Sequence, residues 1–152
     1  MNLDFVSLIT GAILAISGGA FVEWLKLKMQ TKQELNFLKI SFSDELEGII
    51  SIIGKLNEMW EKTGMVHKAY VNDLANNLNA YHDHRSRLFL FKDTELRRGI
   101  ISFYKQLEEL IKESEDKVGS LADTPEAKTE QERIKNKFCF LLTEAKQIKL
   151  KF

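Results

Sequence analysis

FVSLITGAILAISGGAFV, residues 5–22, is the stretch that decides the architecture of this chain, because it runs for eighteen residues without a charge. A helix rises 1.5 Å per residue, so the run covers about 27 Å, close to the ~30 Å thickness of a bilayer's hydrocarbon core. Trp24 and Leu25 extend it further. The sequence therefore predicts a single N-terminal transmembrane helix, within a membrane and juxtamembrane segment of residues 1–32.

Two alternatives compete with this prediction. A cleaved signal peptide has basic residues before a shorter apolar core, whereas Met1 to Asp4 contain an acid and no Lys or Arg. A buried helix of a soluble core rarely runs this far without a polar face. Both alternatives are therefore weaker than a membrane-spanning helix.

The charges that flank the run predict its orientation. Lys26, Lys28 and Lys32 follow it, while only Asp4 precedes it. Lys-rich flanks remain on the cytoplasmic side of a membrane. We therefore expect a single-pass protein of the cell inner membrane, with its N-terminus outside and the domain of residues 33–152 in the cytoplasm.

The apolar run also carries small residues at regular spacing. Gly11, Ala15 and Gly19 recur every four residues and therefore share one side of a helix. Small residues at this spacing let two membrane helices approach closely enough for van der Waals packing. This stripe predicts self-association of the transmembrane helix.

Composition limits what residues 33–152 can be. The chain has 22 Lys and Arg against 22 Asp and Glu, and this balance argues against binding to long nucleic acids, which usually requires a basic excess. A single cysteine, Cys139, lies in an apolar run and is expected in the core. One proline and frequent Lys, Glu and Leu favour helices throughout.

Apolar periodicity predicts four amphipathic helices, and hence an all-α, four-helix-bundle-like domain. A first stripe runs from Leu35 to Trp60, with a bend or fresh start near Ser41 and a stop at Gly64. The second helix is expected from Met65 to Tyr81. Residues 82–91 fit either an extended segment or a helical turn. The other helices begin at Asp93 or Thr94 and at Pro125, and their expected core positions are Leu96, Ile100, Phe103, Leu107, Leu110, Ser114, Val118, Ile134, Phe138, Leu141, Ala145 and Ile148.

Motifs for catalysis are missing from the sequence. There is no phosphate-binding loop, no GxGxxG and no HExxH, so we expect no enzymatic activity and no cofactor. His82, Asp83 and His84 are the nearest approach to a metal site, but zinc needs at least three ligands in fixed geometry. These side chains are more simply explained as solvent-facing residues at a helix end.

A cationic and aromatic segment, residues 81–98, is the best candidate for a binding site. Arginine side chains and helix N-termini both favour phosphate, and aromatic rings stack on bases. The alternative is that Arg97 and Arg98 pair with nearby acids such as Asp73, Asp93 and Glu95. The predicted ligand-binding residues are Tyr81, His82, His84, Arg85, Arg87, Phe89, Lys92, Arg97 and Arg98.

The layout of one membrane helix followed by a compact helical domain resembles the membrane-bound ancillary effectors of type III CRISPR systems. The residues that suggest this are the Gly11/Ala15/Gly19 stripe and the cationic segment. The resemblance implies an antiviral effector that binds cyclic tetra-adenylate as a homo-oligomer, such as a tetramer, and perturbs the bilayer. The alternative from another class is a structural tether, in which the stripe from Leu35 to Trp60 docks a partner protein at the membrane.

Overall fold

The computed structural model describes residues 2–64, 66–117 and 124–152, with the side chains of residues 2–17 and 116–117 excepted. All regular structure in these residues is helical, which confirms the predicted all-α class. The elements are α1 (Asn2–Thr63), α2 (Lys68–Asn76), α3 (Asn79–His84), the 3₁₀ helix η1 (Arg85–Leu90), α4 (Thr94–Lys117) and α5 (Pro125–Lys149).

The chain divides into an N-terminal unit, residues 1–37, and a bundle unit, residues 38–152. Helix α1 contributes its first half to one unit and its second half to the other. The division therefore falls between Phe37 and Leu38, a few residues beyond the boundary expected from the sequence.

The N-terminal unit is helical and exposes large apolar side chains. Phe21 and Trp24 stack with ring centroids 5.9 Å apart, and the Lys28 ammonium lies 5.0 Å from the Trp24 ring. Of the predicted packing stripe, Gly19 faces open space: apart from its chain neighbours and its own helix backbone, no atom lies within 4 Å of a Cβ placed on it. Gly11 and Ala15 lie outside the described side chains. Among the described residues, no helix is both long and apolar enough to cross a membrane.

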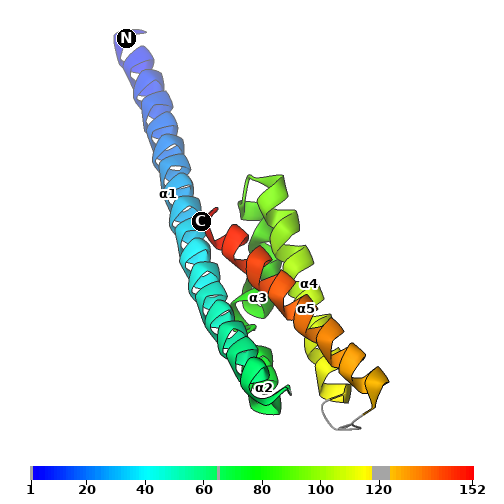
Figure 1. Ribbon diagram of the computed structural model, residues 1–152. Coiled ribbons are helices and arrows are strands. Elements are labelled where there is room, and N and C mark those ends of the chain that lie inside the picture. The colour runs from blue at the N-terminus through cyan, green and yellow to red at the C-terminus, as the bar shows by residue number, and fades with distance from the viewer. Residues whose placement is uncertain (1, 65, 118–123) are drawn as a thin grey trace. The chain divides into compact units, whose positions relative to one another are not determined.

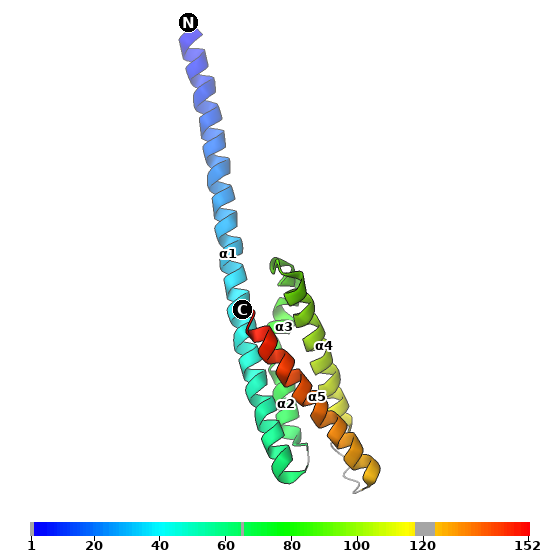
Figure 2. The same cartoon turned by 45° about the horizontal axis from the view of Figure 1, so that its top comes forward.

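The bundle unit follows an up-and-down path. Helix α5 lies against both α1 and α4 (Figure 1), and the Lys149 ammonium contacts the Glu47 carboxylate of α1 at 2.9 Å. Figure 2 shows α2 and α3 running back along the second half of α1. Gly48 permits this approach, because a Cβ there would lie 3.2 Å from the Asn77 amide oxygen.

The predicted apolar stripes form the core of the bundle unit. All five core positions predicted for α5 are buried. The core positions predicted for α4 are buried too, except Val118, which lies outside the described residues. Val71, Tyr104 and Ile111 are also buried but were not predicted. On α1 the buried residues are Leu38, Phe42, Leu46, Ile49, Ile53, Leu56 and Trp60.

The helix predicted over residues 65–81 is wrong, because it is divided into α2 and α3. Asparagine side chains bond to nearby backbone and compete with the helical pattern. Asn77 donates from its side chain to the Asp73 carbonyl at 2.9 Å, and Asn79 donates to the Asn76 carbonyl at 3.1 Å. For residues 82–91 the sequence allowed either an extended segment or a helical turn. The structure has the helical alternative, with the end of α3 followed by η1.

Two further predictions are corrected. Helix α1 is continuous through Ser41, so no fresh start occurs there. Cys139 is exposed and does not belong to the core. It directly follows the buried Phe138, and a helix turns about 100° per residue, so a neighbour of a buried position often faces outward.

Three of the predicted helix ends are confirmed, at Gly64, Asp93 and Thr124. Gly64 closes α1 with φ at +69°, a conformation that favours glycine, and donates its N–H to the Trp60 carbonyl at 2.7 Å. Asp93 caps α4 by accepting the backbone N–H groups of Glu95 and Leu96 at 2.9 and 3.0 Å. Thr124 caps α5 ahead of Pro125.

We expect Phe42→Ala to destabilise the bundle by about 3–5 kcal/mol, because it removes a fully buried ring from the core. The centroid of the Phe42 ring lies 6.1 to 6.4 Å from the ring centroids of Phe91, Tyr104 and Phe152. Urea unfolding followed by circular dichroism measures the loss. The control Ile40→Ala, at a 60% exposed site on the same helix, should change stability by about 0.5 kcal/mol or less. Equal effects of the two substitutions would contradict the assigned core.

Candidate functional site

The predicted ligand-binding residues fall on three consecutive elements of the bundle unit. Helix α3 carries Tyr81, His82 and His84, and η1 carries Arg85, Arg87 and Phe89. The connection to α4 carries Lys92, and the first turn of α4 carries Arg97 and Arg98. The cationic segment is therefore continuous in the chain and built on a short helix, a 3₁₀ helix and a helix N-terminus.

The aromatic residues of this segment differ in burial. Tyr81 is 8% exposed, and its ring is parallel to that of Tyr104 with centroids 4.3 Å apart. Phe91 is also buried, against Phe42. Phe89 is 67% exposed. Of the two rings predicted to contact a base, Tyr81 is therefore buried and Phe89 is exposed to solvent.

Most cations of the segment are free of ion pairs. Arg85, Lys92 and Arg98 are exposed, and together with Arg97 they form no ion pair within 4.0 Å of any acid that the structure describes. The alternative in which Arg97 and Arg98 pair with nearby acids is thus not what is observed. His82 differs, because its Nε2 lies 3.5 Å from the Glu108 carboxylate.

The structure offers no support for a metal site at His82, Asp83 and His84. In the described parts of the chain, no three His, Cys, Asp or Glu side chains gather closely enough to hold a metal ion.

Glu45 of α1 is the residue of this region that sequence reasoning missed. Its carboxylate accepts the backbone N–H of Ala80 at 2.5 Å and that of Tyr81 at 3.2 Å. These donors belong to the first turn of α3. The side chain of Glu45 therefore bonds directly to the helix on which the cationic segment begins.

Burial sets the ionisation of Glu45 and its neighbour Tyr104. Removal from water raises the pKa of Glu45, and the Tyr104 hydroxyl, the two backbone N–H groups and His82 oppose this by favouring the carboxylate. Burial, followed by the nearby Glu45 charge, raises the pKa of Tyr104. The Tyr104 hydroxyl is buried and makes no hydrogen bond of normal geometry with the described residues, although it lies near enough to Glu45 to affect both groups.

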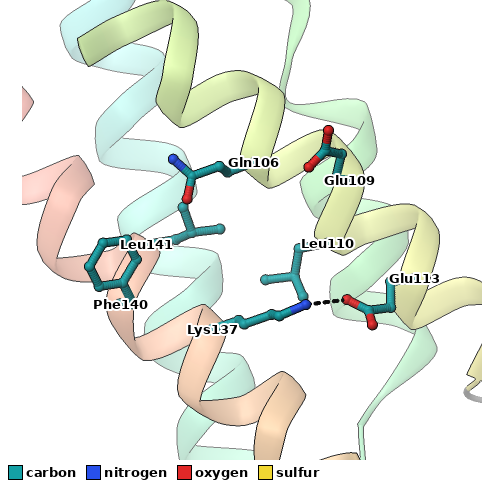
Figure 3. A pocket seen from close by; sticks show the side chains of 7 residues that line it. All are labelled: Gln106, Glu109, Leu110, Glu113, Lys137, Phe140 and Leu141. Atoms are coloured by element: carbon teal, nitrogen blue, oxygen red, sulfur yellow. Dashed lines mark hydrogen bonds and ion pairs between the residues drawn. The ribbon is translucent and has the colours of Figure 1, made fainter.

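Among the described residues, a groove lies between α4 and α5 (Figure 3). It measures about 240 Å³ and is lined by Gln106, Glu109, Leu110, Glu113, Lys137, Phe140 and Leu141. Ligand pockets usually occupy about 300–1,000 Å³. The Lys137 ammonium is bonded to Glu113 at 2.7 Å, so the groove's cation is already neutralised and suits an anionic ligand poorly.

A partial sequence signal for Glu45 exists. It lies between Phe42 and Leu46 of the buried stripe, and a carboxylate at the edge of such a stripe is expected to have a specific partner. The partners lie 35 and 36 positions further along the chain. No local pattern identifies bonds over that distance.

No protein-family model, curated protein or solved structure matches this chain. A functional assignment therefore depends on the residues themselves and on the resemblance in layout described above.

We expect Glu45→Gln to remove a pH-dependent part of the stability. Because the pKa of Glu45 is raised above its ordinary value of 4.5, the folded protein binds this proton more tightly than the unfolded chain does. The contribution is complete below pH 4.5 and is lost as pH rises through the raised pKa. The stability of the parent relative to the variant should therefore fall as the pH rises above 4.5 and through the raised pKa of Glu45.

Urea unfolding at a series of pH values measures this difference. Glu47→Gln, at an exposed site on the same helix, is the control and should retain the pH dependence of the parent. Burial also raises the pKa of Glu144, so some dependence persists in both variants. Parallel stability curves for the parent and Glu45→Gln would contradict the prediction.

Proposed function

We propose that this chain is a membrane-anchored antiviral defence effector whose bundle unit binds a cyclic oligoadenylate as a homo-oligomer and thereby disturbs the bilayer. One observation carries the proposal: exposed cations without ion pairs share one short segment of sequence with an exposed aromatic ring, in a chain with zero net charge. This combination suits a ligand with both phosphates and bases.

Charge in the segment supports a phosphate ligand. Residues 82–98 contain five Lys and Arg against three Asp and Glu, and the Asp93 carboxylate is occupied by the α4 cap. Four of these five cations are arginines, whose planar guanidinium groups bind phosphate through two parallel hydrogen bonds. Phe89 supplies a ring on which a base can stack.

Oligomerisation follows from the charge of such a ligand. A cyclic tetranucleotide carries four phosphates, and one copy of the segment would have to neutralise all of them. A symmetric assembly would need only one or two donors from each subunit. We infer that a homo-oligomer such as a tetramer forms, with Gly11, Ala15 and Gly19 at the contact between membrane helices.

The membrane anchor in this proposal is the apolar run of residues 5–22. Its length matches the hydrocarbon core of a bilayer. The exposed Trp24 and Lys28 that follow suit the boundary with lipid headgroups on the cytoplasmic side. Ligand bound by the bundle unit would act on this anchor through α1, the helix to which both belong.

The structural tether receives less support. Its docking surface was the apolar stripe from Leu35 to Trp60, and from Leu38 onward that stripe is buried by the other helices of the bundle unit. A partner would need to displace the core to reach it. The effector is therefore the function that we propose.

We expect Arg85→Ala and Arg97→Ala to abolish detectable binding of cyclic tetra-adenylate. A hydrogen bond to a charged group contributes about 1.5–3 kcal/mol, and a symmetric site loses one in every subunit. Isothermal titration of the purified full-length protein measures binding. Lys68→Ala removes an exposed cation on α2, outside the segment, and should leave affinity unchanged. Parent-like affinity in both arginine variants would place the site elsewhere, and no binding by the parent would reject this ligand.

We expect the residues from Lys26 onward to face the cytoplasm. In a Cys139→Ser background, which removes the exposed native thiol, Asn2→Cys should react with a membrane-impermeant thiol reagent in intact cells. Thr31→Cys should react only after lysis, because the reagent cannot cross the membrane. Labelling of position 31 in intact cells would reverse the orientation, and recovery of both variants in the soluble fraction would reject the anchor.

A further inference from the structure

The first turn of α3 lacks a cap from its own sequence. The residue before it is Leu78, which has no side-chain oxygen, and no side-chain cap is formed there. Helix α3 has six residues, too few to be stable alone in water. The backbone N–H groups of Ala80 and Tyr81 in this turn instead donate to Glu45, which reaches them from α1.

Tyr104 of α4 joins the same contact. Its ring stacks on Tyr81 of α3, and its hydroxyl lies beside the Glu45 carboxylate. The ionisable groups that face this contact are His82 and Arg85 from the segment and Glu108 from α4. Helices α1, α3 and α4 therefore meet at Glu45.

We propose that Glu45 is a positioning residue for the ligand: it holds α3, and η1 behind it, against α1, and so keeps the phosphate-binding side chains in one arrangement. This rests on the proposed function, since it concerns the same binding surface. It also makes Glu45 a direct connection between that surface and α1, the helix that continues towards the predicted membrane anchor.

Whether neutralising Glu45 raises or lowers ligand affinity distinguishes a positioning role from a simple effect of its charge. Glu45 is an acid close to a surface that binds a polyanion, so neutralising it should strengthen binding by Coulomb's law alone. If Glu45 positions the segment, neutralising it weakens binding instead. A glutamine keeps the shape but has a single oxygen acceptor, so it cannot accept both backbone N–H groups with separate oxygens.

The experiment is a titration of full-length Glu45→Gln with cyclic tetra-adenylate, combined with hydrogen exchange of the unliganded protein. We expect about a tenfold loss of affinity, with amides of Ala80 and Tyr81 exchanging about tenfold faster and the amides of α4 unchanged. Glu47→Gln removes an acid two residues away and leaves the α3 contact intact, so its affinity should equal or slightly exceed that of the parent. Tyr104→Phe keeps the stacked ring but removes the hydroxyl beside Glu45. It should therefore lower ligand affinity, but by less than Glu45→Gln does.

Two results would overturn the proposal: tighter binding by Glu45→Gln, or unchanged exchange at Ala80 and Tyr81. Faster exchange throughout the bundle unit would also overturn it, because Glu45 would then support the whole fold and not this segment. If the parent fails to bind cyclic tetra-adenylate, the proposed ligand is wrong. The exchange of Ala80 and Tyr81 in the unliganded variant still decides whether Glu45 positions the segment.

Discussion

Burial of the α1 stripe between Leu38 and Trp60 is the constraint on which the bundle unit depends. Phe42 lies where this stripe meets aromatic rings from the connection after η1, from α4 and from the C-terminal residue Phe152. Once these apolar side chains are sequestered, the position of Glu45 is fixed, because it lies one turn beyond Phe42 on the same helix. The carboxylate is then drawn out of water and must find donors, which α3 provides.

Sequence reasoning succeeded where the fold depends on local periodicity. The five buried positions of α5 follow a strict spacing of three and four, and caps such as Asp93 and Thr124 act within three residues. It failed between α2 and α3, because local asparagine contacts and a distant carboxylate together outweigh the helical pattern there. The difference in exposure between Phe89 and Tyr81 was not predictable either, since it depends on which ring Tyr104 covers.

The construction of the cationic segment suits a surface that rearranges on binding. A 3₁₀ helix has poorer hydrogen-bond geometry than an α-helix, and elements stabilised by few contacts are those that move most readily. η1 has one buried residue, Leu88, while Arg85, Arg87 and Phe89 around it are exposed. Helix η1 is therefore held from both sides, by the contacts of α3 with Glu45 and Tyr104 before it and by Phe91 and the α4 cap after it.

In the proposed effector, the few cations available in each subunit would be enough to drive a switch. Moving a two-state equilibrium from 1:99 to 99:1 requires a difference in binding free energy of about 5.5 kcal/mol between the states. A charge-assisted hydrogen bond contributes about 1.5–3 kcal/mol, so one bond per subunit of a tetramer, formed in one state only, supplies about 6 kcal/mol or more. A bond made equally well in both states contributes nothing to the switch. Under the proposed function, the cations that would drive the switch are those whose position depends on how α3 and η1 are held. Arg85, next to the end of α3, would therefore contribute more than Arg98 on the long helix α4.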